Sequence, residues 1–446
     1  MKFEIDKQTL NDLAIFQNDN SNDSILNLFN KTITYGGRDK LKEFFSYPLT
    51  DAEQITQRLD AIRYLQENDI DFTCDRGSCD FIEHYLLQRN KPILVPGIRA
   101  IEKWIVYKIK GDSDYYVIER GIEYLLELLQ QLKNFTETVS VDLLPALLQQ
   151  FHSIISSTIL DNKDFSEVFK LAVQKKLSAT DIARADRLFR STGNKELKIL
   201  IDIVYQLDVF ITVAATGNEL GFCLPVIRDV DEQTLVLKGL FHPMIDQPVP
   251  NDVAFDHNKN ICFVTGANMA GKSTFLKSVG ICTFLSQIGF PVPAAYMETS
   301  VFKGLITTIN LGDNINQGNS HFYSEVLRVK HVAEKMSQSQ PVLVIFDELF
   351  RGTNVKDAYD ASLAIIKAFA RVRKSFFIIS THIVEVANEL AAIDNIDFRF
   401  METTFDDEVP TYSYKLRDGI TEERMGMWIV NNAGIVNIIN DFLNKK

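Results

Sequence analysis

The feature that most constrains the fold is a glycine-rich octapeptide between two apolar stretches of the chain. Residues 266–273 read Gly-Ala-Asn-Met-Ala-Gly-Lys-Ser, which fits the pattern G-x-x-x-x-G-K-[ST]. The apolar run 261–265 precedes the octapeptide, and Phe275, Leu276 and Val279 follow it at helical spacing. This order of strand, loop and helix lets backbone N–H groups ring a phosphate at the positive end of the helix. The sequence therefore predicts a phosphate-binding loop here.

The residues of this loop have distinct expected roles. Lys272 is expected to meet the β- and γ-phosphates of a nucleotide, and the Ser273 hydroxyl is expected to ligate Mg²⁺. We therefore predict that the chain takes ATP and Mg²⁺ as cofactors. The predicted nucleotide-binding residues are Gly266, Ala267, Asn268, Met269, Ala270, Gly271, Lys272, Ser273 and Thr274.

Acidic residues and a histidine follow two later apolar runs. The run 342–346 ends in Asp347 and Glu348, which is the Walker-B arrangement of an apolar buried strand followed by acids. We expect Asp347 to hold the Mg²⁺ shell and Glu348 to orient or deprotonate the attacking water. A third run, 376–380, leads to His382. ATPases of the ABC type place a histidine there to sense the γ-phosphate, and we predict that role for His382.

The two halves of the chain differ in their hydrophobic pattern. Up to residue 217, Leu and Ile recur at three- and four-residue spacing, as in 122–129 and 197–204, which indicates helices. Beyond that point, short apolar strands alternate with helical stretches, which indicates a mostly parallel sheet covered on both faces. We therefore predict an α/β protein with a helical domain at 1–217 and an α/β domain at 218–446.

Composition limits the class of protein further. The 446 residues include 47 basic and 59 acidic side chains, for a formal net charge of -12. That balance argues against binding to nucleic acid by bulk charge. It is compatible with DNA binding through a local basic surface. Five cysteines are an odd number, so we expect no disulfide framework and a cytoplasmic location. We see no apolar stretch of roughly 18 uncharged residues, and we expect no membrane partner.

Four motifs, in this order along the chain, resemble those of the MutS family of DNA mismatch repair proteins. Residues 265–274 are similar to the family's phosphate-binding loop, including its Asn-Met pair. Residues 317–325 are similar to its signature segment, and 347–354 look like its Walker B running into the D-loop. Residues 380–382, Ser-Thr-His, match the family's Ala-Thr-His. Upstream, 32–41 resembles the start of the MutS core domain, so the resemblance covers most of the chain.

The resemblance implies an architecture and a set of roles. It implies a helical core with levers, followed by an ABC-type ATPase domain whose helical tail packs across a dimer. In such a homodimer each site is composite: Ser320 reaches the γ-phosphate bound by the opposite subunit, while Glu348 and His382 act on their own subunit's nucleotide. The resemblance also implies mismatched or branched duplex DNA as a partner, with a MutL-like protein as a further candidate.

Two departures from the family pattern matter. The family usually supplies an aromatic residue that stacks on adenine, but the corresponding segment 247–252 contains none, so the base contact stays open. The family reads mismatches with an N-terminal α/β domain that carries a Phe-x-Glu wedge, and we expect this chain to lack that domain. Phe-x-Glu occurs at 81–83, 135–137 and 165–167, each in a helical-looking stretch. We interpret these three matches as chance.

The leading functional hypothesis is an ATP-dependent DNA-binding protein whose ATP cycle drives a dimeric clamp in DNA mismatch repair or related DNA processing. One alternative within the family is a binder of branched or recombination DNA. Another is a nucleotide-switched protein-interaction ATPase that does not bind DNA, which the acidic balance motivates. The basic run between 175 and 198 fits either DNA phosphate contacts or a solvated helix face balanced by acids.

Overall fold

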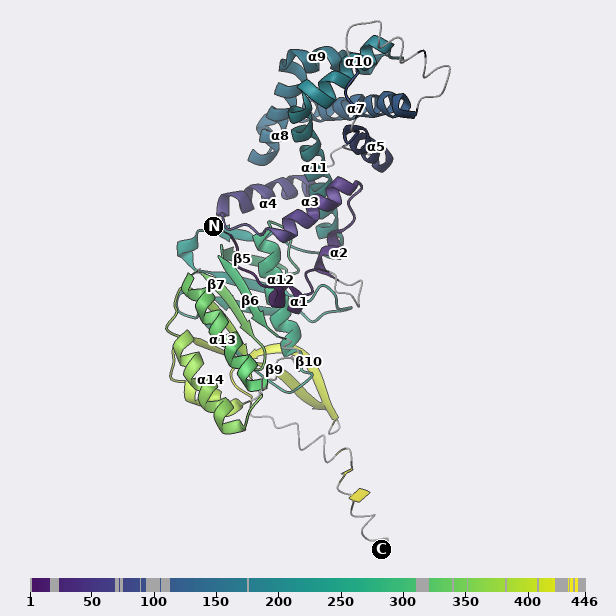
Figure 1. Ribbon diagram of the computed structural model, residues 1–446. Helices are drawn as coiled ribbons and strands as arrows, with labels where there is room; N and C mark the ends of the chain where they lie inside the picture. The colour runs from purple at the N-terminus through teal and green to yellow at the C-terminus, as the bar shows by residue number, and fades with distance from the viewer. Residues whose placement is uncertain are drawn as a thin grey trace. The chain divides into compact units, whose positions relative to one another are not determined.

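A computed structural model shows a chain that forms two compact units (Figure 1). Unit 1 comprises Met1–Ile25, Pro48–Ile55 and Leu220–Lys446, and unit 2 comprises Leu26–Tyr47 and Thr56–Glu219. Helices and two sheets confirm the predicted α/β class, whereas the core-and-lever and ABC-type assignments stay predictions. The structure describes residues 2–16, 24–68, 72, 75–88, 90–93, 105, 113–174, 176–309, 321–338, 341–350, 352–381, 383–406, 409–421, 432, 434, 435, 438 and 439.

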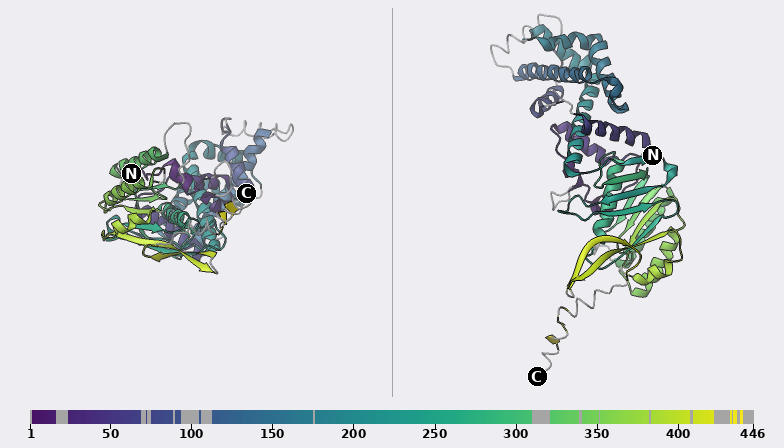
Figure 2. Two further views of the ribbon diagram at one scale, coloured as in Figure 1. Left: turned by 90° about the horizontal axis from the view of Figure 1, so that it is seen from below. Right: turned by 180° about the vertical axis from the view of Figure 1, so that it is seen from behind.

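The larger sheet of unit 1 has six strands in the order β10-β9-β4-β8-β7-β6. Its strands are β4 (Ile261–Thr265), β6 (Gly304–Thr308), β7 (Val342–Phe346), β8 (Phe376–Ser380), β9 (Ile396–Asp406) and β10 (Val409–Asp418). Strands β9, β4, β8, β7 and β6 pair in parallel, and β10 pairs antiparallel with β9. This pairing confirms the prediction of a mostly parallel sheet. The view from behind in Figure 2 shows β9 and β10 as the yellow pair of strands. Every residue of β4, β7 and β8 is buried, which explains their continuous apolar sequences.

Helices cover both faces of this sheet. They are α12 (Lys272–Gln287), α13 (His321–Gln338), α14 (Val355–Phe369) and α15 (Val384–Leu390). Val344 and Phe346 of β7 share a core cluster with side chains of α13, α14 and α15. Ile345 faces the other way, and it would lie 3.4 Å from a Cβ added at Gly280 of α12. Because the parallel strands end at one edge, the loops that follow β4, β7 and β8 are brought to that same edge.

A smaller sheet of unit 1 has the strand order β1-β5-β2-β3. Its strands are β1 (Val226–Arg228), β2 (Leu235–Leu240), β3 (Asn251–Phe255) and β5 (Tyr296–Ser300). Strand β2 pairs antiparallel with both β3 and β5, and β1 pairs parallel with β5. The connection between β2 and β3 runs through the segment 241–250, which lies beside the start of α12 and lines a pocket there.

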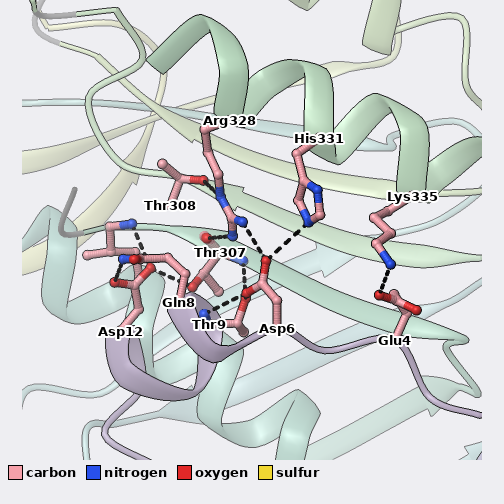
Figure 3. Close-up of polar contacts among 11 residues, drawn as sticks. Glu4, Asp6, Gln8, Thr9, Asp12, Thr307, Thr308, Arg328, His331 and Lys335 are labelled. Carbon is pink, nitrogen blue, oxygen red and sulfur yellow. Dashed lines mark hydrogen bonds and ion pairs between the residues drawn. The ribbon is translucent and has the colours of Figure 1, made fainter. Parts of the chain in front are cut away.

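The N-terminal residues lie against β6, and Figure 3 shows the polar side-chain contacts between Glu4–Asp12 and the segments 307–308 and 328–335. Glu4 forms a parallel bridge with Gly304, and α1 (Lys7–Asp12) then packs beside β6. The Asp12 carboxylate accepts hydrogen bonds from the Thr307 hydroxyl at 2.7 Å and the Ile309 amide at 2.9 Å. The helical domain predicted at 1–217 includes residues 1–25. These contacts place them with the sheet instead, because a short amphipathic segment does not show in its sequence which partner it will bury against.

Among the described residues of unit 2, the regular elements are all helices. Its helices, with α2 and α4 at the border with unit 1, are α2 (Ile25–Phe29), α3 (Tyr35–Ser46), α4 (Ala52–Glu67), α5 (Arg76–Leu86), α7 (Ser113–Thr138), α8 (Ala146–Ser156), α9 (Lys163–Phe169), α10 (Ala179–Arg187) and α11 (Asn194–Leu220). Asp186 is fully buried, and it accepts hydrogen bonds from the Tyr85 hydroxyl at 2.9 Å and the Ile93 amide at 2.7 Å. Arg190 makes two further bonds to the same carboxylate. A buried charge is tolerated here because its lone pairs are occupied.

The three Phe-x-Glu matches all lie within helices of unit 2, namely α5, α7 and α9. The Phe135 and Phe165 rings are buried among these helices, so neither is presented for stacking on a base. The interpretation of the three matches as chance stays a prediction.

Two observations concern membranes and cysteines. Among the described residues one helix, α11, is long and apolar enough by itself to cross a membrane, but 67% of its apolar window is buried inside the structure. That burial is typical of a core helix. Cys79 is disulfide-bonded, while Cys223, Cys262 and Cys282 are free. We did not expect this bond, because the number and spacing of cysteines do not show which thiols approach each other.

Candidate functional site

The predicted phosphate-binding loop connects β4 to α12 at the carboxyl edge of the larger sheet. Its backbone is left-handed at three points: φ is 137° at Gly266, 69° at Met269 and 101° at Gly271. A Cβ added at Gly266 would lie 3.0 Å from the Met401 Cβ and 3.2 Å from the Met401 amide nitrogen, so strand β9 leaves room only for glycine. The loop is thus shaped both by local backbone preference and by its sheet neighbour.

The Lys272 ammonium lies inside this loop. It donates to the carbonyl oxygens of Gly266 at 2.8 Å and Ala267 at 3.0 Å, and the residue is only 5% exposed. Burial lowers the pKa of Lys272, while the nearby Glu348 and Asp347 carboxylates oppose that shift. The positive charge of Lys272 therefore lies where β4, the loop and the N-terminus of α12 meet.

The two predicted metal ligands lie next to each other. The Ser273 hydroxyl, in the first turn of α12, donates a hydrogen bond to Oδ2 of Asp347, which directly follows β7. The Asp347 amide donates to the Thr308 carbonyl at 2.9 Å, which ties Asp347 to the end of β6. The order of strands in the sheet has thus brought together two oxygen-bearing side chains that are distant in sequence.

Glu348 adopts a left-handed conformation, with φ of 57°, and so does Phe350, with φ of 60°. A non-glycine residue in this region is strained, and such strain is concentrated at functional sites. The Glu348 amide is held by the Ser380 hydroxyl, which accepts its hydrogen bond at 2.9 Å. The chain therefore turns sharply at the point where the predicted water-activating residue lies.

Helix α13 contributes a buried acid to the same region. Glu325 is 5% exposed, and it accepts a hydrogen bond from the Gly352 amide at 3.2 Å. Glu325 belongs to the segment that resembles the MutS signature, and Gly352 belongs to the D-loop. Glu325 also lines a small pocket, together with Thr308, Ile309, Val329, Phe346, Asp347, Glu348, Leu349 and Phe350.

Two predicted site residues and the predicted tail lie largely outside the described part of the chain. Ser320 and His382 are among the residues whose placement the structure does not describe, and their roles stay predictions. The helical tail that the family resemblance implies corresponds to residues 437–443, of which only Ile438 and Ile439 are described.

A second pocket, of about 320 Å³, opens beside the glycine-rich loop. It is lined by Leu240, Phe241, His242, Ile245, Asp246, Gln247, Pro248, Val249, Asn251, Gly271, Thr274, Phe275, Ser278 and Tyr414. Its size falls within the range of ligand pockets, and its lining combines aromatic, apolar and polar groups. The pocket therefore continues the loop with a mainly apolar compartment.

The aromatic residues of this pocket were missed in the sequence. We searched 247–252 for an aromatic side chain, but Phe241 and His242 precede that segment, and Tyr414 comes from β10. Burial and the nearby Lys277 lower the pKa of His242 to about 4, so this imidazole is neutral at pH 7. Tyr414 could not be found from local pattern, because only the pairing of β10 with β9 brings it to the loop.

Fold and site together define an α/β protein whose glycine-rich loop, cationic centre and adjoining acids have the form of a phosphate-binding site. The MutS domain V family matches residues 262–445, the segment that contains this loop and both acids. Over this segment the chain is similar to the MutS family.

Individual members of that family are also similar to this chain. The DNA mismatch repair protein MutS of Halalkalibacterium halodurans is 27% identical over 256 residues, which cover 55% of this chain and 29% of that protein. MutS protein homolog 4 of Homo sapiens is 29% identical over 236 residues, or 50% of this chain and 24% of that protein. MutS of Petrotoga mobilis is 23% identical over 520 residues, which cover 96% of this chain and 63% of that protein. The chain thus spans less than two thirds of the length of these relatives.

Proposed function

We propose that this chain binds ATP and Mg²⁺ at the glycine-rich loop and hydrolyses the nucleotide, as an ATPase of the DNA mismatch repair type. The observation that carries the proposal is the hydrogen bond between Ser273 and Asp347 beside the Lys272 ammonium. It joins the two predicted metal ligands to the predicted phosphate-binding cation at one point of the sheet edge.

The residues present fit a hard divalent cation. Ser273 and Asp347 offer hydroxyl and carboxylate oxygens, the ligand types that Mg²⁺ prefers alongside water and phosphate oxygens. When bound, the ion would neutralise charge that develops on the phosphates. Ser273 and Asp347 would hold it.

The protein's own groups would do the remaining work. The backbone amides of the loop and the N-terminus of α12 would bind the phosphates, and Lys272 would exchange its two carbonyl partners for phosphate oxygens. Glu348, set apart from the strand by its left-handed backbone, would accept a proton from the attacking water or orient it. In this proposal Ser320 of a second copy and His382 complete the site.

The second pocket would take the nucleoside. Phe241 and Tyr414 offer faces on which a purine can stack, and neutral His242 can exchange a hydrogen bond with a base or ribose. Gly271 and Thr274 of the glycine-rich loop line this pocket, so it directly adjoins the proposed phosphate site. The contact with adenine that the sequence left open would thus be made by residues of the β2–β3 connection and β10.

DNA and protein partners belong to the same proposal. The relatives carry the names of DNA mismatch repair proteins, which supports duplex DNA as the partner of this chain. A homodimer, a clamp-like motion on DNA, a MutL-like partner and a cytoplasmic location follow from the family resemblance as further expectations. Binding to branched DNA and action as a DNA-independent switch are the outcomes against which this proposal is tested.

The test combines nucleotide binding, turnover and DNA binding on the purified chain. Lys272→Ala should abolish ATP binding, whereas Glu348→Gln should bind ATP and fail to hydrolyse it. Lys259→Ala is the matched control, because Lys259 also donates to a backbone carbonyl, that of Ile396, but at the opposite end of β4. Wild-type ATP binding that survives Lys272→Ala would refute the assignment.

DNA binding is measured with homoduplex, single-mismatch and four-way-junction substrates, with and without ATP and at several salt concentrations. Phosphate contacts give a steep loss of affinity with salt. A preference for mismatched duplex supports the mismatch repair type, and a preference for junctions supports the branched-DNA alternative. ATP turnover without DNA binding at low salt would leave only the switch protein.

A further inference from the structure

Ser380 occupies a central position in the site that no predicted role has accounted for. It is the last residue of β8, the strand that separates the loop-bearing β4 from the acid-bearing β7. Its register partner on β4 is Val264, and its side chain is fully buried. Burying a hydroxyl at the end of the apolar run 376–379 costs free energy unless the hydroxyl is hydrogen-bonded. Its hydrogen-bond partners therefore indicate its role in the site.

Both bonds of this hydroxyl go to the adjoining acids. Ser380 Oγ donates to Oδ1 of Asp347 and accepts from the Glu348 amide at 2.9 Å. The Ser380 carbonyl also accepts from the Leu349 amide at 3.4 Å. One buried hydroxyl therefore uses its donor and an acceptor position on two consecutive residues of the site.

The consequences for the two acids differ. On Asp347, the bond to Oδ1 fixes the rotation of the carboxylate, so that Oδ2 is left facing the Ser273 hydroxyl. On Glu348, the bond to the amide holds the backbone in its left-handed conformation, which determines where that side chain leaves the chain. A polar partner that orients a ligand carboxylate influences metal affinity without touching the metal.

We propose that Ser380 is a positioning residue, which orients Asp347 for the metal and Glu348 for the attacking water. The inference rests on the proposed function, which it deepens. The family motif that this segment resembles has alanine at this position, so the hydroxyl is a feature of this chain beyond the motif, and Ser380→Ala is expected to fold.

The chain offers a close structural control at the other end of the same strand. Ser375 directly precedes β8 and is fully buried, and its hydroxyl accepts a hydrogen bond from the Val342 amide at the first residue of β7, at 3.3 Å. Ser375→Ala therefore removes one bond between the same two segments, far from the acids. Ser380→Thr and Ser380→Val form a second pair, which share their shape and differ only in the hydroxyl.

The experiment measures metal affinity directly and turnover separately. Mn²⁺ binding is followed by electron paramagnetic resonance in the presence of a non-hydrolysable ATP analogue, and ATP affinity is measured without metal. We expect Ser380→Ala and Ser380→Val to weaken Mn²⁺ binding about tenfold, with metal-free ATP affinity unchanged. The Mg²⁺ concentration for half-maximal turnover should rise in parallel. Ser380→Thr and Ser375→Ala should stay near wild type.

Two results would overturn the inference. One is a folded Ser380→Ala protein with unchanged Mn²⁺ affinity and turnover, and the other is an equal loss in Ser375→Ala, which would show a purely structural effect. If the bulkier Ser380→Thr and Ser380→Val proteins fail to fold, the comparison of Ser380→Ala with Ser375→Ala still tests the inference. Failure of the proposed function is a separate outcome, since wild-type protein would then bind neither the ATP analogue nor Mn²⁺ with it.

Discussion

Replacing Asp12 by alanine should loosen the end of β6. In the native chain this carboxylate is 3% exposed, and it accepts from Thr307 Oγ1, from the Ile309 amide and, through its other oxygen, from Gln8 Nε2. The Ile309 amide is the last donor described before the segment that leads to α13. Alanine removes the acceptor and leaves two buried donors without it.

The expected magnitude follows from these two donors. Hydrogen bonds to a charged group contribute roughly 1.5–3 kcal/mol each, and orphaned buried donors carry a comparable penalty. Taking the lower value for each donor, opening of the β6 end should become easier by about 3 kcal/mol. That corresponds to a loss of protection against hydrogen exchange on the order of 100-fold. Asp12→Asn, which keeps an oxygen acceptor, should lose less.

Hydrogen–deuterium exchange with mass spectrometry measures this directly on peptides that span 304–309. Gln8→Ala is the control, since it removes a partner of Asp12 but leaves Thr307 and Ile309 with their acceptor. We expect this control to change protection less than tenfold. If exchange in 304–309 were unaltered by Asp12→Ala, the N-terminal segment would not be stabilising β6, and the contacts of Figure 3 would be without energetic weight.

Three further predictions concern the pocket, a partly buried ion pair and the helical unit. Tyr414→Ala should weaken ATP binding about tenfold without affecting the affinity for inorganic triphosphate, as measured by calorimetry, because it removes only a stacking surface. Burial tends to raise the pKa of Asp6, but the hydrogen bond from Arg328 and others outweigh it and hold that pKa below 3.8. The contribution of Asp6 to stability should therefore be complete above pH 3.8 and lost as pH falls through the lowered value, and Asp6→Asn should flatten that part of the denaturation profile. Tyr85→Phe should lower the free energy of unfolding by about 1–2 kcal/mol in urea, since it removes a donor from buried Asp186.

Local sequence patterns were sufficient to predict much of the fold. The alternation of apolar strands and helices after residue 217 predicted a mostly parallel sheet, and the strand pairing agrees. The glycine-rich loop lies where the pattern predicted it, between β4 and α12, because glycine spacing and flanking apolar runs report on backbone within a few residues. Ser273 and Asp347 were both predicted as metal ligands, and the structure shows them hydrogen-bonded.

Local sequence patterns did not predict the contacts between segments that are distant in the chain. The N-terminal residues read as part of the helical half, yet Asp12 lies against Thr307 and Ile309. The pocket beside the loop takes Phe241 from the connection between β2 and β3 and Tyr414 from β10, so a search of one segment could not find its aromatic residues.

The sequence by itself determined that this chain has a strand–loop–helix with the chemistry of a phosphate site and two acids after a later strand. Only the tertiary structure decided that β8 lies between the strands bearing them, and hence that Ser380 reaches both acids. The physical reason is that strand order is set by how the whole sheet buries its two faces, whereas each strand's own residues show only that it is buried.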